Sequence, residues 1–174
     1  MTDAPGVPLP SELWKRLSAD RRLVAAEAFW RDDNAATEQA EMIATIAQRI
    51  KFRMKSVMAM PVEKKVRQLV SLPAISEAVA ARILVAYHLA HQRPLMGRFL
   101  DALGIAHEDG LIADESVTPP EQERLAAAVQ TLAASCPAED VSLYLSTLFW
   151  QDSDTWGNLA DLPEVRPVSH PSAV

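Results

Sequence analysis

Apolar residues recur at intervals of three and four along most of this chain, and prolines lie where that spacing breaks. Side chains at such intervals share one face of an α-helix. The sequence holds 12 prolines and 5 glycines, and no stretch alternates apolar and polar residues long enough to predict a sheet. The pattern therefore predicts an all-α fold: one compact domain of about seven helices over residues 11–162, with flexible tails at residues 1–10 and 163–174.

Capping residues and prolines predict where the helices begin. Ser11, Ser18 and Ser76 each precede an apolar-periodic segment, and serine is a favoured N-cap residue. Thr118 and Glu121 have the spacing of a capping box. The predicted helices span residues 12–17, 19–31, 35–59, 61–71, 77–92 and 94–104, followed by two helices that begin at Pro119 and Pro137. The apolar helix at residues 77–92 is predicted to lie at the centre of the domain.

Glycine marks the end of the helix predicted at residues 94–104. Gly104 follows the last apolar position, and glycine readily adopts the left-handed backbone conformation that closes many helices. Between residues 105 and 117 the helical spacing lapses. Asp109-Gly110 suits the type I′ turn of a hairpin, but an isolated pair of strands is marginal, so a plain loop is expected here.

The composition favours a soluble protein of the cytoplasm. Cys136 is the only cysteine, which excludes an intramolecular disulfide and suits a reducing compartment. The first ten residues lack the basic and apolar regions of a signal peptide. The least polar stretch, residues 78–90, is too short to cross a bilayer, which takes about 20 apolar residues. The sequence therefore predicts no membrane partner.

Charge is divided unevenly along the chain, whose formal net charge is −6. Residues 1–98 carry 15 basic and 10 acidic side chains, whereas residues 99–174 carry 2 basic and 13 acidic ones. Positive charge is most concentrated at residues 49–68, which hold seven Lys or Arg and a single Glu. The sequence thus predicts a basic half joined to an acidic half.

The basic segment lies at the end of the longest predicted helix, residues 35–59. If this helix is unbroken, Ile50, Met54 and Met58 belong to its inward apolar stripe, and Phe52 points away from that stripe. An aromatic ring on the outer face, flanked by cations, is unusual for a helix with one apolar and one polar face. The predicted interaction surface consists of Arg49, Lys51, Phe52, Arg53, Lys55, Lys64, Lys65 and Arg67.

Four interpretations of this basic segment remain open. The cations are solvated side chains near a helix C-terminus, where the helix dipole favours them. In a second interpretation the acidic half folds back onto the basic half, and a neighbouring helix covers Phe52. In a third, Phe52 is the centre of a protein-binding or self-association face with charges at its rim. In the fourth, a base stacks on Phe52 while phosphates bind the cations.

The leading hypothesis is a non-catalytic protein-interaction or assembly module, and a homodimer through the long helix is one form of it. This hypothesis predicts that Phe52 is shielded in the assembly and that Phe52→Asp weakens self-association. Nucleic-acid binding through the phosphate backbone is the alternative, using the cations of residues 49–67. The acidic half counts against this alternative, because it would repel phosphate unless it faced away.

Residues 72–84, LPAISEAVAARIL, add to the nucleic-acid alternative. This stretch resembles the helix-hairpin-helix motif, in which Leu-Pro-Gly-hydrophobic-Gly joins two short helices, and an Ala and an Ile-Leu pair follow in the second. The matching residues are Leu72, Pro73, Ile75, Ala80, Ile83 and Leu84. The resemblance implies a tight turn that contacts a phosphate. Ala74 and Ser76 replace the two glycines that allow this approach, and Ser76 also suits a helix cap.

The sequence carries no catalytic or cofactor signature. It has no HExxH sequence, no paired-cysteine spacing and no glycine-rich loop after a strand, so no cofactor is predicted. His88 and His91 lie three apart on one helix, and His107 follows in the irregular segment, which makes the three weak candidates for a metal site. A small metal-dependent enzyme is therefore a third hypothesis, and a non-catalytic role is favoured over it.

Overall fold

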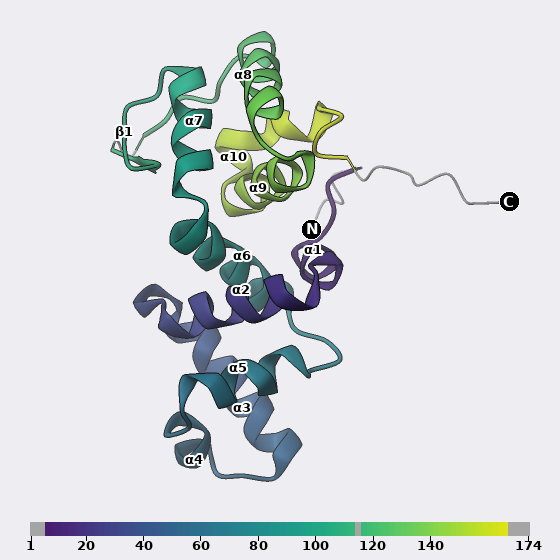
Figure 1. Ribbon diagram of the computed structural model, residues 1–174, viewed down its shortest axis with the longest axis vertical. Helices are drawn as coiled ribbons and strands as arrows, with labels where there is room; N and C mark the ends of the chain where they lie inside the picture. Colours follow the sequence, from purple (N-terminus) through teal and green to yellow (C-terminus); the bar gives the residue numbers. More distant parts are fainter. Residues whose placement is uncertain (1–5, 114–115, 167–174) are drawn as a thin grey trace, which may run out of the picture. The chain divides into compact units, whose positions relative to one another are not determined.

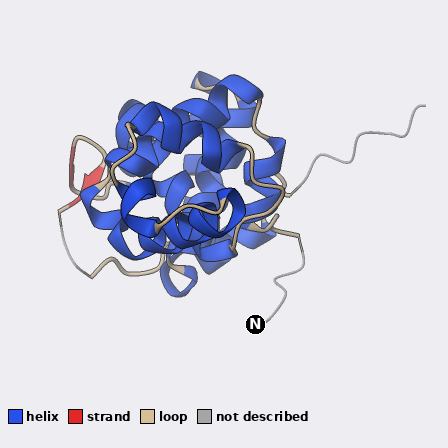
Figure 2. Cartoon of the chain, turned by 90° about the horizontal axis from the view of Figure 1, so that it is seen from below, coloured by secondary structure: helices blue, strands red, loops and turns tan. Residues whose placement is uncertain are grey.

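The computed structural model describes residues 6–113 and 116–166. These residues form ten α-helices, two short 3₁₀-helices and one two-stranded hairpin, which confirms the all-α prediction (Figure 2). There are more helices than predicted, because the segment 35–59 is split in two and a short helix forms near residue 155. In this described part, no helix has the combination of length and apolar character needed to span a membrane.

The chain divides into two compact units, which are described separately. We call Leu9–His91 the basic unit, because it carries 13 basic and 9 acidic side chains. The second unit joins Gln92–Val174 to Met1–Pro8, and we call it the acidic unit, because it carries 4 basic and 14 acidic side chains. The single domain over residues 11–162 stays a prediction.

The basic unit is a helical bundle arranged around one apolar helix. Its elements are α1 (Pro10–Arg16), α2 (Ala19–Arg31), η1 (Asp33–Ala35), α3 (Ala36–Ile50), α4 (Met54–Met58), α5 (Val62–Val70) and α6 (Glu77–His91). Helix α6 packs against α1, α2 and α3, and α2 also packs against α5 (Figure 1). The fully buried side chains include Phe29, Ile46, Leu69, Ile83 and Leu84. The apolar segment predicted to be central is therefore central to this unit.

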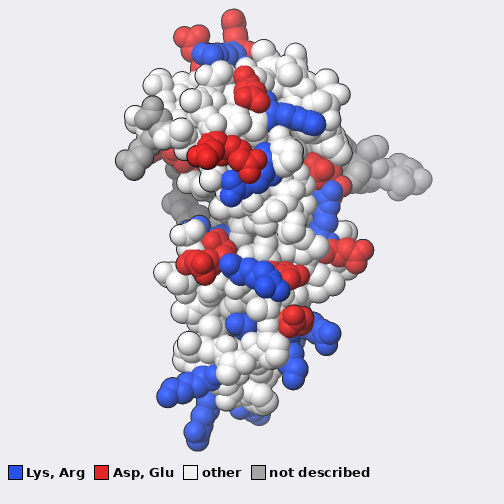
Figure 3. All heavy atoms as spheres, turned by 60° about the vertical axis from the view of Figure 1, so that its left-hand side comes forward, with Lys and Arg blue, Asp and Glu red and all other residues white. Residues whose placement is uncertain are grey.

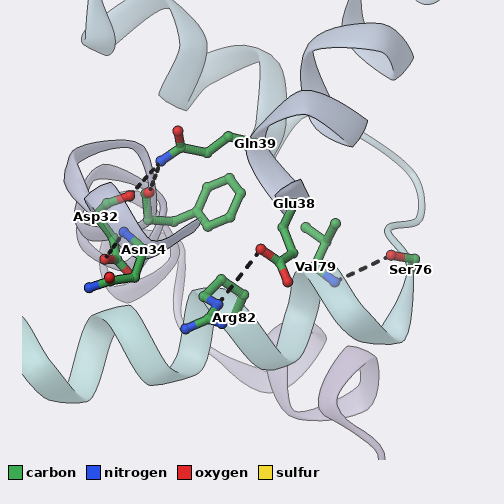
Figure 4. A network of polar contacts seen from close by, with 8 residues as sticks. Asp32, Asn34, Glu38, Gln39, Ser76, Val79 and Arg82 are labelled. Atoms are coloured by element: carbon green, nitrogen blue, oxygen red, sulfur yellow. Dashed lines mark hydrogen bonds and ion pairs between the residues drawn. The ribbon is translucent and has the colours of Figure 1, made fainter. Parts of the chain in front are cut away.

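Polar contacts at the edge of this core tie α3 to its neighbours (Figure 4). The side-chain amide of Gln39 in α3 donates to two carbonyl oxygens at the end of α2, those of Phe29 at 2.7 Å and Asp32 at 3.0 Å. Glu38 forms an ion pair of 3.7 Å with Arg82 of α6. The Gln39 amide thus caps carbonyl oxygens at the end of α2, and the ion pair links α3 to α6.

The acidic unit contains the hairpin and the remaining helices. Its elements are α7 (Arg93–Leu103), β1 (His107–Glu108), β2 (Leu111–Ile112), α8 (Gln122–Ser135), α9 (Ala138–Gln151), α10 (Ser153–Trp156) and η2 (Gly157–Asp161). Helix α8 packs against α7 and α9, and α9 also contacts α10 and η2. The Phe99 ring lies 5.7 Å from the Tyr144 ring and 5.8 Å from the Trp156 ring, centroid to centroid. These aromatic contacts hold α7, α9 and α10 together.

The prediction of flexible tails is wrong for the parts of residues 1–10 and 163–174 that pack into the acidic unit. Val7 and Val165 are buried, and the indole N–H of Trp150 donates to the carbonyl oxygen of Pro8 at 2.8 Å. The prediction of flexible tails otherwise concerns residues 1–5 and 167–174, which lie outside the described residues.

Several predicted helix ends are confirmed by hydrogen bonds. Ser18 caps α2 by accepting from the Arg21 amide at 3.2 Å, and Ser76 caps α6 by accepting from the Val79 amide at 3.3 Å. Gly104 closes α7 with φ +66°. Local sequence determines these ends because each side chain or backbone preference acts within one helical turn.

Two predicted caps are wrong. Ser11 lies inside α1, where its amide and hydroxyl both donate to the Glu77 carboxylate of α6. Thr118 precedes an extended segment, and α8 begins after Glu121. The Ser11 hydroxyl therefore bonds to a residue distant in the sequence and not to the backbone at the start of α1.

The prediction of a plain loop after α7 is also wrong, because the hairpin alternative forms. β1 and β2 pair antiparallel, with His107 opposite Ile112 and Glu108 opposite Leu111. Asp109 and Gly110 have φ +50° and +81°, as a type I′ turn requires. The strands are stable despite their length because they pack against α7.

Candidate interaction surface

The predicted unbroken helix over residues 35–59 is wrong, because α3 ends at Ile50. Lys51 adopts the left-handed conformation with φ +56° and ψ +40°. The amides of Lys51 and Phe52 both donate to the carbonyl oxygen of Ala47, the latter at 2.9 Å. This is the hydrogen-bond pattern that closes a helix before the chain turns away. A non-glycine residue in this conformation costs about 1 kcal/mol, so contacts formed after the turn must offset that cost.

The contact that follows the turn is made by Val57 in α4. The chain is extended at Arg53, whose carbonyl oxygen accepts from the Ser56 and Val57 amides at 2.9 and 3.2 Å. The resulting helical turn packs against α3 and buries Val57 completely. Fully burying a valine side chain stabilises a fold by roughly 1.5 kcal/mol, which is enough to offset the left-handed lysine.

The same helical turn leaves its methionines in solvent. Met54 and Met58 are 50% and 58% exposed, and Phe52 just before them is 56% exposed. Met54 and Met58 are four residues apart on α4, so they share one face. We call Phe52, Met54 and Met58 the apolar cluster. In the described residues it holds three of the six large apolar side chains that are exposed, all within seven positions.

Five exposed cations of the predicted site, on the same segment as the apolar cluster or on α5 that follows it, have no partner in the described chain. They are Lys51, Arg53, Lys55, Lys64 and Arg67, and none forms an ion pair or side-chain hydrogen bond with another described residue. At the lower end of Figure 3, where α4 lies, Lys and Arg side chains project around a largely uncharged surface. We call the apolar cluster with these five cations the interaction surface. Its charges are available to a partner.

Two of the eight predicted site residues have partners within the basic unit. The Arg49 guanidinium donates to the carbonyl oxygen of Ser71 at 2.7 Å, which ties α3 to the segment after α5. The Lys65 ammonium lies 5.2 Å from the centroid of the Trp30 ring, within range of a cation–π contact. The other six predicted residues belong to the interaction surface.

The sequence prediction missed Met54 and Met58 as members of this surface. The apolar spacing predicts them on the inward stripe, because a straight helix would align them with Ile50. The turn at Lys51 changes the register, so that Val57 alone of the three later apolar residues points inward. Nothing in the sequence near residue 51 signals this break, because a lysine occupies the position that a glycine would mark.

The segment that resembles a helix-hairpin-helix motif joins α5 to α6, so its two-helix arrangement is as expected. The Ser76 hydroxyl caps α6, as the second interpretation of this residue predicts. Ala74 is exposed and carries a side chain where the motif has glycine. Whether this turn contacts a phosphate stays a prediction.

The three candidate metal ligands are not brought into one cluster. His88 is buried and donates from Nδ1 to the Leu84 carbonyl oxygen at 2.7 Å, while His91 is exposed beside the Tyr87 ring. His107 belongs to the other unit, where it contacts Asp101. No group of three or more His, Cys, Asp or Glu residues in the described chain is placed to hold a metal ion.

Comparison with known proteins identifies no relative. No protein family, no curated protein and no solved structure matches this chain. The resemblance at residues 72–84 is therefore without support from a family match.

Proposed function

We propose that this chain is a non-catalytic protein-interaction module of the cytoplasm and that the interaction surface is its contact site. The observation that carries this proposal is the apolar cluster, in which Phe52, Met54 and Met58 are each at least half exposed. Aromatic residues, methionine and arginine are enriched where proteins meet. Exposed apolar side chains scattered singly need no explanation, but three on one short segment do.

The size of the apolar cluster indicates what else a partner must provide. Covering three half-exposed side chains would contribute roughly 3 kcal/mol, since full burial of one such side chain contributes about 1.5–3 kcal/mol. A dissociation constant of 1 mM already corresponds to about 4 kcal/mol. Apolar contact alone is therefore insufficient, and a partner must also engage the surrounding cations. Methionine suits such a site because its flexible side chain adapts to the partner's shape.

Site-specific photocrosslinking in the producing cell tests this proposal. A photoreactive phenylalanine analogue placed at position 52 is expected to form a covalent adduct with a protein. The same analogue at Leu23, which is 42% exposed on α2 outside the surface, is the matched control and should form none. Adding Met54→Asp and Met58→Asp should abolish the adduct at position 52. Absence of any protein adduct at position 52, or equal adducts at both positions, would contradict the proposal.

Nucleic-acid binding is a second candidate, favoured by the five unpaired cations around an exposed aromatic ring. Phosphates would bind the cations and a base would stack on Phe52. This candidate leaves Met54 and Met58 without a role and acts against a net charge of −6. A mobility-shift assay at low salt tests it: binding should weaken steeply with added salt, and Arg53→Glu with Lys64→Glu should abolish it. Failure to shift any probe at low salt would end this candidate.

A further inference from the structure

The acidic unit exposes a small surface whose chemistry is complementary to the interaction surface. Leu111 at the start of β2 is 43% exposed, and it is the sole large apolar side chain exposed in the described part of that unit. Glu108 and Asp109 at the hairpin tip are exposed, and the nearby Asp101 side chain is 75% exposed. We call Glu108–Leu111 the acidic hairpin. It presents one apolar side chain beside carboxylates, where the interaction surface presents apolar side chains beside cations.

Hydrogen bonds to α7 hold the acidic hairpin in a fixed conformation. The Gly110 amide donates to Nδ1 of His107 at 3.0 Å, so the ring proton is on Nε2, which donates to the Asp101 carboxylate at 2.9 Å. The Arg93 guanidinium donates to the carbonyl oxygen of Asp109 at 3.3 Å. A surface that is already ordered loses little conformational entropy on binding.

We propose that the acidic hairpin of one copy of this chain docks on the interaction surface of a second copy. This inference rests on the proposed function and names the partner. Leu111 would cover the apolar cluster, and the carboxylates of Glu108 and Asp109 would lie beside Lys51, Arg53 and Lys55. Four of the six exposed large apolar side chains in the described residues belong to these two surfaces, which carry opposite charge.

The proposed contact joins two different surfaces, so its assembly has a recognisable geometry. Each copy would use its interaction surface once and its acidic hairpin once, which builds head-to-tail chains or closed rings, of which a reciprocal pair is the smallest. The cations and carboxylates would speed association and make it sensitive to salt. This contact between unlike surfaces differs from the predicted homodimer through the long helix, which stays a prediction.

Sedimentation of two complementary variants tests this arrangement. The surface variant carries Met54→Asp and Met58→Asp. The hairpin variant carries Glu108→Lys and Asp109→Asn, because asparagine tolerates the left-handed conformation of Asp109. The wild-type protein should associate with rising concentration and dissociate as salt is added. Each variant alone should associate at least about tenfold more weakly, because each lacks one half of the contact.

Mixing the two variants gives the decisive result. The surface variant retains a hairpin and the hairpin variant retains a surface, so an equimolar mixture should form a dimer and nothing larger. If the surface variant proves unstable by circular dichroism, Arg53→Glu with Lys55→Glu replaces it, since both side chains are exposed. A mixture that stays monomeric, or a hairpin variant that associates like the wild type, would overturn the inference.

The outcomes separate this inference from the proposed function. A wild-type protein that is monomeric at all concentrations overturns docking between copies, yet an adduct between position 52 and a different protein would still support the interaction module. Absence of any protein adduct at position 52 would contradict both the docking between copies and the interaction module. An adduct between position 52 and the acidic hairpin of another copy, located by mass spectrometry, would support both.

Discussion

Two helices in this protein end in the same way, but only one of these ends can be recognised from the sequence. In α7 the amide of Ile105 donates to the carbonyl oxygen of Leu100 at 2.9 Å, and Gly104 is left-handed. In α3 the amide of Phe52 donates to the Ala47 carbonyl oxygen, also at 2.9 Å, and the left-handed residue is Lys51. Glycine adopts this conformation at no steric cost, whereas a lysine must be held in it by the rest of the fold.

The residues that follow the two ends differ in a way that bears on function. Ile105 is partly buried after α7, whereas Phe52 at the equivalent position after α3 is 56% exposed. A hydrophobic residue at this position commonly packs back on its own helix. The exposed Phe52 is thus a departure from the usual arrangement, and it lies at the centre of the proposed contact.

The largest expected effect concerns the residue that holds the α3 end in place. Val57→Asp would bury a carboxylate without a partner and should destabilise the protein by about 3 kcal/mol or more. Met58→Asp is the matched control, since the same change one residue later falls on a 58% exposed side chain and should alter stability by less than about 0.5 kcal/mol. Urea denaturation measures both. Equal losses would show that Val57 is not the residue that anchors α4.

The second effect concerns the hairpin that follows the α7 end. A Cβ atom at Gly110 would lie 2.9 Å from the Arg93 carbonyl oxygen, and the residue has φ +81°. Gly110→Ala should therefore cost about 2 kcal/mol, part from the left-handed conformation and part from the backbone contact. At Gly157 a Cβ would meet nothing within 4 Å, so Gly157→Ala should be neutral or slightly stabilising. Thermal melts of the two variants that coincide would contradict this account.

A smaller loss is expected at the glycine that closes α7. Gly104→Ala places a Cβ at φ +66°, 2.9 Å from a terminal nitrogen of the Arg124 side chain. That side chain is flexible and can move, so the cost should be mainly the conformational term of about 1 kcal/mol. Denaturant midpoints measure the change. A loss as large as that of Gly110→Ala would show that the Arg124 contact is rigid.

The smallest effect has the opposite sign and tests the α3 end directly. Lys51→Gly should stabilise the protein by about 0.5–1 kcal/mol, because it removes the left-handed strain. The same replacement inside α4, Lys55→Gly, should instead cost up to about 1 kcal/mol, since glycine is unfavourable within a helix. Destabilisation by Lys51→Gly would mean that the end of α3 is not strained.

The sequence predicted the fold best where a short-range preference and the tertiary structure agree. Ser18 and Ser76 cap helices as predicted, and Gly104 ends one. Prediction failed at Ser11, whose hydroxyl bonds to a carboxylate 66 residues away. It also failed at the hairpin, where the Asp109-Gly110 turn was recognised but the support from α7 was not.

The candidate surface was predicted in part. The prediction placed Phe52 on the outer face of an unbroken helix, and that premise is wrong: Phe52 follows the turn at Lys51, where it and the neighbouring cations are exposed. Met54 and Met58 were missed because a spacing rule cannot distinguish an inward stripe from one that follows a break. The sequence could not show that Arg49 and Lys65 have partners within the basic unit, because Ser71 and Trp30 lie far away in the sequence.

By itself the sequence determined that the chain is helical, where most helices begin, and that its basic side chains gather in one segment, since these depend on neighbouring residues. Only the tertiary structure decided that a lysine would take a glycine's conformation at residue 51. The reason is energetic: a local strain of about 1 kcal/mol is offset when the turn allows Val57 to pack against α3 and become buried. The turn at Lys51 also exposes Met54 and Met58, which no rule based on neighbouring residues predicts.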